Sequence, residues 1–170
     1  MDGDAAVEIT IRVARREDAA TIHQAIRDLA EAVGDSGKVL SSADDFRRHG
    51  FGASPAFGCL VAEKGKIFAG LCLHFPSFST WFGKPGVYVQ DLFIAPEFRG
   101  RGVGEKLLQR LAADTREAGG EYLRLSVHAN NSAAQRFYER AGLSWSKDER
   151  IFAARGNSFR RLAEGDRKDR

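Results

Sequence analysis

Hydrophobic residues recur along this chain at two spacings, and these spacings predict where its strands and helices lie. Residues 8–14 carry Ile9, Ile11 and Val13 at every second position, which is the period of a strand with one buried face. In residues 17–34 the apolar side chains lie three or four positions apart, as in an amphipathic helix, and Gly34 is expected to end that helix. Residues 35–55 are mostly polar, and we expect a loop there with a short helix at 43–49.

Apolar runs follow one another from residue 57 onwards, and they predict a sheet. Three strands are expected at 57–63, 66–75 and 86–95, with a tight turn at Gly65 between the first two. An amphipathic helix is expected after Gly104, and Gly119 and Gly120 would close it. The chain would then end with a strand at 121–129, a short helix at 130–142 and a last strand at 149–155. This order of elements predicts an α/β fold in which helices cover a mixed sheet.

The size and composition of the chain are those of one globular domain, with 170 residues, 43% of them hydrophobic and 29% charged. We expect a single domain over 1–170, with a core at about 8–163 and a frayed tail at 164–170. No apolar run approaches the roughly 20 residues of a membrane span, and residues 1–14 lack the apolar core of a signal peptide. A cytoplasmic protein without membrane contact is therefore expected.

Charge and the metal-binding residue types exclude several other classes of function. The net charge is +3, but basic and acidic residues are mixed along the chain, so nucleic acid is not expected as a partner. Cys59 and Cys72 lie in apolar segments without metal-ligand spacing and are expected to be reduced core residues. The four histidines are scattered, and no metal site is expected.

Three glycines at alternate positions, Gly100, Gly102 and Gly104, precede the helix that follows the strand at 86–95. One glycine would suffice for a tight turn, which is the simpler explanation. Three of them leave backbone N–H groups unshielded beside the positive end of a helix dipole, an arrangement that suits a phosphate or pyrophosphate. Glu105 and Leu107 occupy the positions where a Rossmann fingerprint needs its third glycine, and no Walker motif is present.

The glycine loop (residues 99–105) resembles the acetyl-CoA loop of the GNAT N-acetyltransferase superfamily, whose pattern is [RQ]-x-x-G-x-[GA]. Residues 130–143, with Asn131, Phe137 and Tyr138, resemble the second signature of that superfamily. From about residue 11 to residue 163 the chain is similar to the diamine and thialysine N-acetyltransferase branch. The resemblance implies a mixed, mostly antiparallel sheet flanked by helices, with a bulged strand and the glycine loop at an acetyl-CoA cleft.

The resemblance also implies a reaction and its residues. Acetyl-CoA would be the cosubstrate, and a primary amine of a small molecule would attack its thioester directly in a ternary complex. Tyr138 would be the general acid that protonates the departing thiolate, although a half-buried aromatic beside Phe137 is the structural alternative. Asn131 would contact pantetheine, or it would only cap the helix that follows. The other expected coenzyme contacts are Leu92, Phe93, Ile94, Arg99, Gly100, Arg101, Gly102, Val103, Gly104 and Glu105.

The expected acceptor site consists of Trp81, Gln90 and Asp91. Gln90 stands where the polyamine enzymes of the branch are expected to carry a glutamate, and a carboxamide cannot act as the base. Asp91 would hold the ammonium or take its proton through water, or it is a structural partner at the bulge. Three further positions where polyamine contacts are expected are Ala32, Val33 and Ser79. A polycation favours several carboxylates in its channel, so spermidine and spermine are not favoured as acceptors.

The sequence leaves two alternative functions open, and the resemblance implies an oligomeric state. Because of Gln90, a non-catalytic acyl-CoA-binding module stays open as an alternative. A protein N-acetyltransferase would need an open groove, whereas the long segment 76–86 suggests a partly closed one. The resemblance implies a homodimer, with the strand around 151–154 at the contact.

Overall fold

The computed structural model describes residues 8–165 of the chain. It divides into two compact units, Met1–Gln135 and Arg136–Arg170. The first unit contains every strand of the described residues and the glycine loop. The second contains the end of α4 (Ser132–Arg140) and the helix α5 (Gly156–Glu164).

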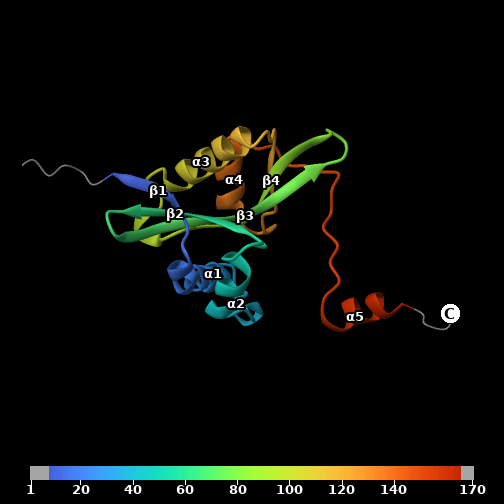
Figure 1. Ribbon diagram of the computed structural model, residues 1–170. Helices are drawn as coiled ribbons and strands as arrows, with labels where there is room; N and C mark the ends of the chain where they lie inside the picture. The colour runs from blue at the N-terminus through green and yellow to red at the C-terminus, as the bar shows by residue number, and fades with distance from the viewer. Residues whose placement is uncertain (1–7, 166–170) are drawn as a thin grey trace, which may run out of the picture. The chain divides into compact units, whose positions relative to one another are not determined.

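A five-stranded sheet forms the centre of the first unit (Figure 1). Its strands are β1 (Ile9–Val13), β2 (Gly58–Lys64), β3 (Ile67–Ser79), β4 (Lys84–Ile94) and β5 (Leu123–Leu125), in the spatial order β1-β2-β3-β4-β5. Neighbouring strands are antiparallel except β4 and β5, which are parallel. The predicted α/β fold with a mixed, mostly antiparallel sheet is confirmed.

Helices cover both faces of this sheet. Figure 1 shows α1 (Ala19–Ala32) and α2 (Ala43–Gly50) on one face and α3 (Val103–Glu117) on the other. Short 3₁₀ helices lie at η1 (Arg16–Asp18), η2 (Ser36–Lys38) and η3 (Pro96–Phe98). Because both faces are covered, the middle strands are apolar on both sides and do not alternate with polar residues. The buried run from Cys59 to Ala62 in β2 is an example.

The core is built from aliphatic side chains of β2, β3, α1 and α3. Ile22, Leu60, Leu71 and Leu107 are the largest of its fully buried side chains. Burying one such side chain stabilises the fold by about 1.5–3 kcal/mol. Cys59 and Cys72 are free and buried, as predicted, and burial raises the pKa of the Cys72 thiol to about 12.

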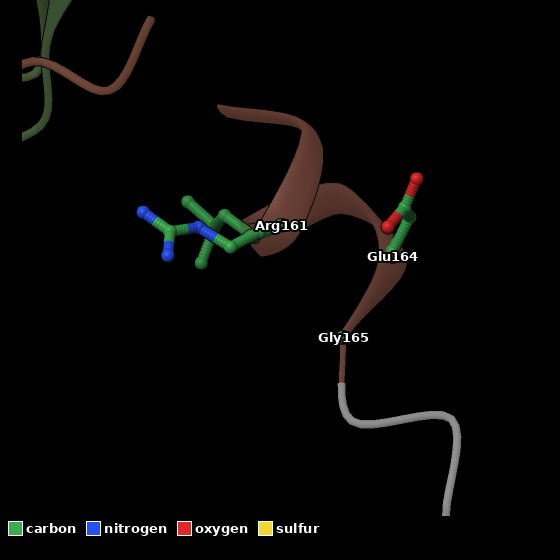
Figure 2. A pocket seen from close by; sticks show the side chains of 4 residues that line it. Arg161, Glu164 and Gly165 are labelled. Carbon is green, nitrogen blue, oxygen red and sulfur yellow. The ribbon is translucent and has the colours of Figure 1, made fainter. Parts of the chain in front are cut away.

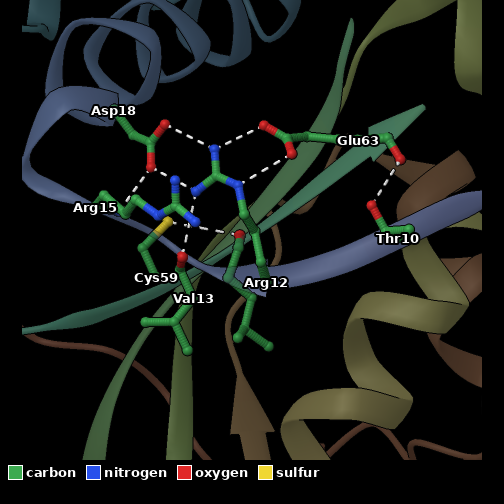
Figure 3. A network of polar contacts seen from close by, with 8 residues as sticks. Thr10, Arg12, Val13, Arg15, Asp18, Cys59 and Glu63 are labelled. Atoms are coloured by element: carbon green, nitrogen blue, oxygen red, sulfur yellow. Dashed lines mark hydrogen bonds and ion pairs between the residues drawn. The ribbon is translucent and has the colours of Figure 1, made fainter. Parts of the chain in front are cut away.

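A charged network joins the first strand to the start of α1 (Figure 3). The Arg12 guanidinium donates through Nη1 and Nη2 to both carboxylate oxygens of Asp18, at 2.7 and 2.9 Å. It also donates to Glu63 on β2, at 2.6 and 3.0 Å. The hydrogen bonds from Arg12 hold the pKa of both carboxyl groups below their usual range. This network fixes where α1 begins relative to β1 and β2.

The structure corrects the sequence predictions for the C-terminal third of the chain. The strand expected at 149–155 is wrong: the described residues 151–155 contain no strand, and α5, which was not predicted, follows them. A strand needs a neighbouring strand to satisfy its backbone groups, and periodicity alone does not supply one. The strand expected at 121–129 is only three residues long, from Leu123 to Leu125. The segment 76–86 extends β3 and β4 into a long hairpin.

Candidate active site

A β-bulge interrupts the pairing of β3 and β4. Leu73 pairs with Asp91 and His74 pairs with Val89, so Gln90 is an extra residue on β4. The parallel pairing of β4 with β5 also ends here, because the pair Val89 and Leu125 is its last. Bulges bend a strand and increase its local twist. Beyond Val89, β4 therefore continues to Ile94 with a strand neighbour on the β3 side alone among the described residues.

The backbone N–H groups of Leu92 and Ile94 point away from β3. The Ala95 N–H donates to the Ala69 carbonyl at 3.0 Å, which makes this pair a hydrogen-bonded one. Hydrogen-bonded and non-hydrogen-bonded pairs alternate along antiparallel strands. The pairs of Gly70 with Ile94 and of Cys72 with Leu92 are therefore of the second kind. Their N–H and C=O groups lie on the side of β4 that β5 leaves uncovered, called the outer edge of β4 here.

Phe93 has a different environment from its two neighbours. By the same alternation its N–H group faces β3, and its side chain is buried. Its ring is stacked on that of Phe68, with the ring centroids 6.3 Å apart. Phe93 is thus a core residue that holds the outer edge of β4 in place.

Asp91 lies in a row of side chains across the sheet. Cys59, Leu73 and Asp91 are direct cross-strand partners and so share one face. Figure 3 shows Cys59 beside the Arg12 and Asp18 pair, which places this row on the face that carries α1. Asp91 is half-buried, and burial raises the pKa of its carboxyl to about 6. A carboxylate with that pKa can exchange a proton near neutral pH.

The two other predicted acceptor residues differ in their distance from Asp91. Gln90, the bulge residue, is adjacent and exposed. Trp81 lies beyond the last pair of the β3–β4 hairpin and is 96% exposed. Lys84, the first residue of β4, is seven positions from Asp91, about 23 Å at the rise of a strand. The hairpin therefore separates Trp81 from Asp91 within one chain.

The glycine loop has the backbone that its sequence predicts. Gly100 and Gly102 have φ angles of +71° and +75°, in the left-handed region that favours glycine. The first hydrogen bond of α3 runs from the Lys106 N–H to the Gly102 carbonyl, at 3.0 Å. The N–H groups of Val103, Gly104 and Glu105 precede it and have no acceptor within the helix. Together with the helix dipole, these amides form a site suited to a phosphate.

Arg99 connects the glycine loop to the outer edge of β4. Its Nε donates to the Ile94 carbonyl at 3.1 Å, and the side chain is otherwise exposed. The Arg101 guanidinium carbon lies 6.0 Å from the centre of the Phe98 ring, a cation–π arrangement. The fold thus brings together Leu92, Ile94 and the whole glycine loop at one end of β4.

Asn131 directly precedes the next helix, α4, and Tyr138 lies within it. The Asn131 side-chain oxygen accepts a hydrogen bond from the Ala134 N–H at 3.1 Å, so this residue caps the helix. This is the alternative role that its sequence position allowed. Tyr138 is half-buried in the second unit, and its ring centroid lies 5.2 Å from that of Phe137.

His74 is a residue of this region that the sequence analysis did not single out. It stands opposite the bulge, and burial lowers the pKa of its imidazole. A Cβ atom at Gly58 would lie 2.6 Å from the His74 ring, so the ring packs directly over a glycine. The pairing of Gly58 with His74 depends on strand register, which leaves no local signal in the sequence.

A hollow of about 340 Å³ is lined by Arg161, Leu162, Glu164 and Gly165 in the second unit (Figure 2), and none of the predicted site residues lines it. Within residues 8–165 no three His, Cys, Asp or Glu side chains are grouped as metal ligands. No helix in that range is long and apolar enough to cross a membrane.

Comparison with known proteins agrees with the fold and the glycine loop. Residues 22–143 match the Acetyltransferase (GNAT) family. The chain belongs to this family, and it is an acetyltransferase.

Several curated relatives are N-acetyltransferases that act on amines. The chain is 34% identical over 166 residues to the thialysine N-epsilon-acetyltransferase of Bos taurus, covering 91% of this chain and 97% of the relative. It is 35% identical to the Mus musculus protein of the same name, covering 90% and 96%. A third relative is the human spermidine/spermine N(1)-acetyltransferase-like protein 1, with 29% identity over 82% of this chain and 21% of that protein. The resemblance stated from the sequence is confirmed.

Solved structures share the fold at lower sequence identity. An integron cassette protein from the mobile metagenome of V. cholerae superposes with a TM-score of 0.77 and 19% identity, covering 92% of this chain and 98% of the other. An aminoglycoside acetyltransferase from an uncultured soil metagenomic sample gives a TM-score of 0.70 at 16% identity, covering 85% and 94%. These likenesses support the fold.

Proposed function

We propose that this protein transfers the acetyl group of acetyl-CoA to a primary amine of a small molecule by direct attack in a ternary complex. The observation that carries the proposal is the outer edge of β4, which is followed, after the short 3₁₀ helix η3, by the glycine loop and the start of α3. That surface presents amide donors over the length of an extended ligand with an anionic end.

The amides of Val103, Gly104 and Glu105 would receive the diphosphate of the coenzyme. The amides of Leu92 and Ile94 would receive the pantetheine arm and the thioester carbonyl. Asn131 would add a pantetheine contact from the residue that caps α4. In this assignment the thioester lies beside the bulge at Gln90 and Asp91.

Acetyl transfer needs a neutral amine, and Asp91 is the proposed acceptor of its proton. With a pKa of about 6, the carboxylate is available near neutral pH and can take the proton directly or through water. The amine nitrogen then forms a bond to the acetyl carbon while the carbon–sulfur bond breaks. The nitrogen loses its second proton as the amide forms. Tyr138 would donate its phenolic proton to the departing thiolate sulfur and recover a proton from that nitrogen through water, while the proton held by Asp91 leaves to solvent.

The acceptor is proposed to be an amino acid with a distal amine, such as a lysine analogue, rather than a polyamine. Asp91 is the carboxylate at the bulge, and its neighbour Gln90 is neutral. Two or three ammonium groups of a polyamine would need more carboxylates than this. The names of some curated relatives support the same class, namely the thialysine and L-ornithine acetyltransferases, whereas one other relative is named for spermidine and spermine.

We further propose a cytoplasmic homodimer. Two free, buried cysteines are in keeping with a reducing compartment. In the second unit, Ile151 and Phe152 are 76% and 92% exposed, and burial against a second copy would remove them from water. Because Trp81 is far from Asp91 of the same chain, it would contact an acceptor only at the Asp91 of the second copy.

A panel of amines tests the proposal, with mass detection of the acetylated product and measurement of free thiol release from acetyl-CoA. Lysine, thialysine, ornithine, putrescine, spermidine and a peptide with a free N-terminus cover the classes in question. We expect turnover with the amino acids that carry a distal amine. Coenzyme A binding without turnover on any amine would instead indicate a non-catalytic module, and turnover on the peptide alone would indicate a protein N-acetyltransferase.

A further inference from the structure

The hydrogen bond between Arg99 and Ile94 closes a short loop at the end of β4. Ile94 is the last residue of that strand, and Arg99 follows the 3₁₀ helix η3. The Ile94 carbonyl that accepts from Arg99 Nε lies on the outer edge of β4, the same side as the Ile94 N–H. The guanidinium is therefore engaged directly beside the amides proposed to bind pantetheine.

The inner side of the same loop is held by separate contacts. The Ala95 N–H donates to the Ala69 carbonyl, and the Phe98 N–H donates to the Ala95 carbonyl at 2.9 Å. The Phe98 side chain is buried. On the outer side, the hydrogen bond from the Arg99 side chain to the Ile94 carbonyl connects the loop to β4. Gly100 and Gly102, which follow Arg99, have left-handed backbone conformations. They have no side chains, so packing at these positions does not hold the loop in place.

Arg99 and Arg101 flank Gly100 but lie in different surroundings. Arg99 donates to a backbone carbonyl of the strand, whereas the Arg101 guanidinium carbon lies 6.0 Å from the centre of the Phe98 ring. An arginine that serves as a hydrogen-bond donor to a carbonyl can be replaced by a neutral donor. An arginine that serves as a charge for phosphate cannot, because the ion pair needs the charge.

We propose that Arg99 is a positioning residue: through the Ile94 carbonyl it holds the glycine loop at a fixed distance from the outer edge of β4. The pantetheine amides and the diphosphate amides then keep the spacing that one extended ligand requires. This inference rests on the proposed use of acetyl-CoA. It differs from the expectation that Arg99 contacts the diphosphate itself.

The test compares two acetyl donors across matched variants. Acetyl-CoA carries the diphosphate, and acetyl-pantetheine lacks it. Arg99→Gln keeps an N–H donor for the Ile94 carbonyl without charge, Arg99→Leu removes the donor, and Arg101→Leu removes the neighbouring charge. For Arg99→Leu we expect KM to rise about tenfold for both acetyl donors, because one hydrogen bond from a charged group is lost. The kcat should change less than threefold. Arg99→Gln should restore KM to within about threefold of the parent for both donors.

Arg101→Leu is the contrast, since it should raise KM for acetyl-CoA and leave acetyl-pantetheine unchanged. Hydrogen exchange in the free protein gives a second readout. The hydrogen-bonded amides of Ala95 and Phe98 should exchange faster in Arg99→Leu and at the parent rate in Arg99→Gln. The inference is overturned if the Arg99→Leu penalty appears with acetyl-CoA alone and Arg99→Gln fails to relieve it, because Arg99 would then be a phosphate ligand.

A failure of the proposed function would look different. If the parent protein turned over no amine, calorimetric binding of coenzyme A and pantetheine to the same variants would replace KM. Equal losses for both ligands in Arg99→Leu would then still support the positioning role. No binding of coenzyme A to the parent protein would overturn both proposals together.

Discussion

Val89 of β4 pairs with Leu125 of β5, and this is the last pair that joins the two strands. One position further along β4 stands Gln90, the residue added by the bulge. The end of strand pairing and the start of the bulge therefore coincide. Their coincidence leaves the Leu92 and Ile94 amides facing outward and Asp91 half-buried on the α1 face.

Replacing Tyr138 with phenylalanine tests the general acid. The ring and its packing against Phe137 are kept, and the phenolic proton is lost. We expect kcat to fall at least about tenfold with the coenzyme A affinity unchanged. Steady-state kinetics and calorimetric binding of coenzyme A measure the two quantities. Normal turnover in Tyr138→Phe would contradict the assignment.

The activity is expected to depend on pH through Asp91. Its carboxyl has a raised pKa of about 6, so it is protonated below that pH and cannot accept a proton from the amine. The kcat/KM should therefore rise with pH through about 6, and Asp91→Asn should abolish this limb of the profile along with most of the activity. A profile in Asp91→Asn with the same limb would assign it to another group.

The same substitution should stabilise the protein at neutral pH. A carboxyl whose folded pKa lies above its unfolded value favours folding at low pH, and this contribution is lost as the pH rises from about 4 to about 6. Asp91→Asn should therefore raise the free energy of unfolding at pH 7 by the order of 1 kcal/mol and leave it nearly unchanged at pH 4. Urea unfolding at the two pH values measures the difference, and a loss of stability at pH 7 would count against the burial argument.

A carboxylate at position 90 should change the acceptor preference. Gln90 is exposed at the bulge beside Asp91, and Gln90→Glu adds a charge with almost no change in shape. We expect the KM for putrescine and spermidine to fall several-fold relative to that for thialysine, since a second carboxylate attracts a second ammonium. Gln90→Met is the neutral control. Equal changes for all acceptors would show that position 90 does not face the substrate.

The left-handed glycines of the loop should not tolerate a side chain. Gly102→Ala places a Cβ atom at a φ of +75°, which costs about 1–2 kcal/mol even though the space around it is open. The coenzyme A affinity should fall with the stability as the loop changes its conformation. Gly52→Ala is the matched control, because Gly52 also has open space but no positive φ. Thermal unfolding and calorimetry compare the two, and equal effects would contradict the prediction.

The Arg12 network is expected to be worth more than an ordinary surface ion pair. Arg12→Leu removes hydrogen bonds to two half-buried carboxylates, Asp18 and Glu63, and should cost about 1–3 kcal/mol of stability (Figure 3). Arg47→Leu, which removes an exposed pair with Asp44, should cost less than about 0.5 kcal/mol. Both carboxyl groups of the network have lowered pKa values, so its contribution should vanish as the pH falls below about 4. Urea unfolding of the two variants at pH 7 provides the measurement, and similar losses would contradict the prediction.

Local chemistry made the helices α1 to α4, the hairpin turn and the glycine loop predictable from the sequence, but not α5. Gly34 and Gly65 have positive φ angles where a helix stop and a hairpin turn were expected. The [RQ]-x-x-G-x-[GA] pattern and the residues around Tyr138 indicated the GNAT family, which the comparison confirms. Such features depend on a few neighbouring residues, so they are visible in a single segment.

Contacts between distant segments decided the rest. The periodicity of residues 149–155 suggested a strand, but a strand exists only where another segment pairs with it, and no segment within residues 8–165 does. The outward direction of the Leu92 and Ile94 amides follows from the register of β3 against β4. The hydrogen bond from Arg99 to Ile94 forms because the loop after β4 folds back towards the end of that strand. By itself the sequence determined the type of loop and the chemistry of its side chains. Only the tertiary structure decided which backbone groups that loop faces, because register and strand separation are set by packing across the whole sheet.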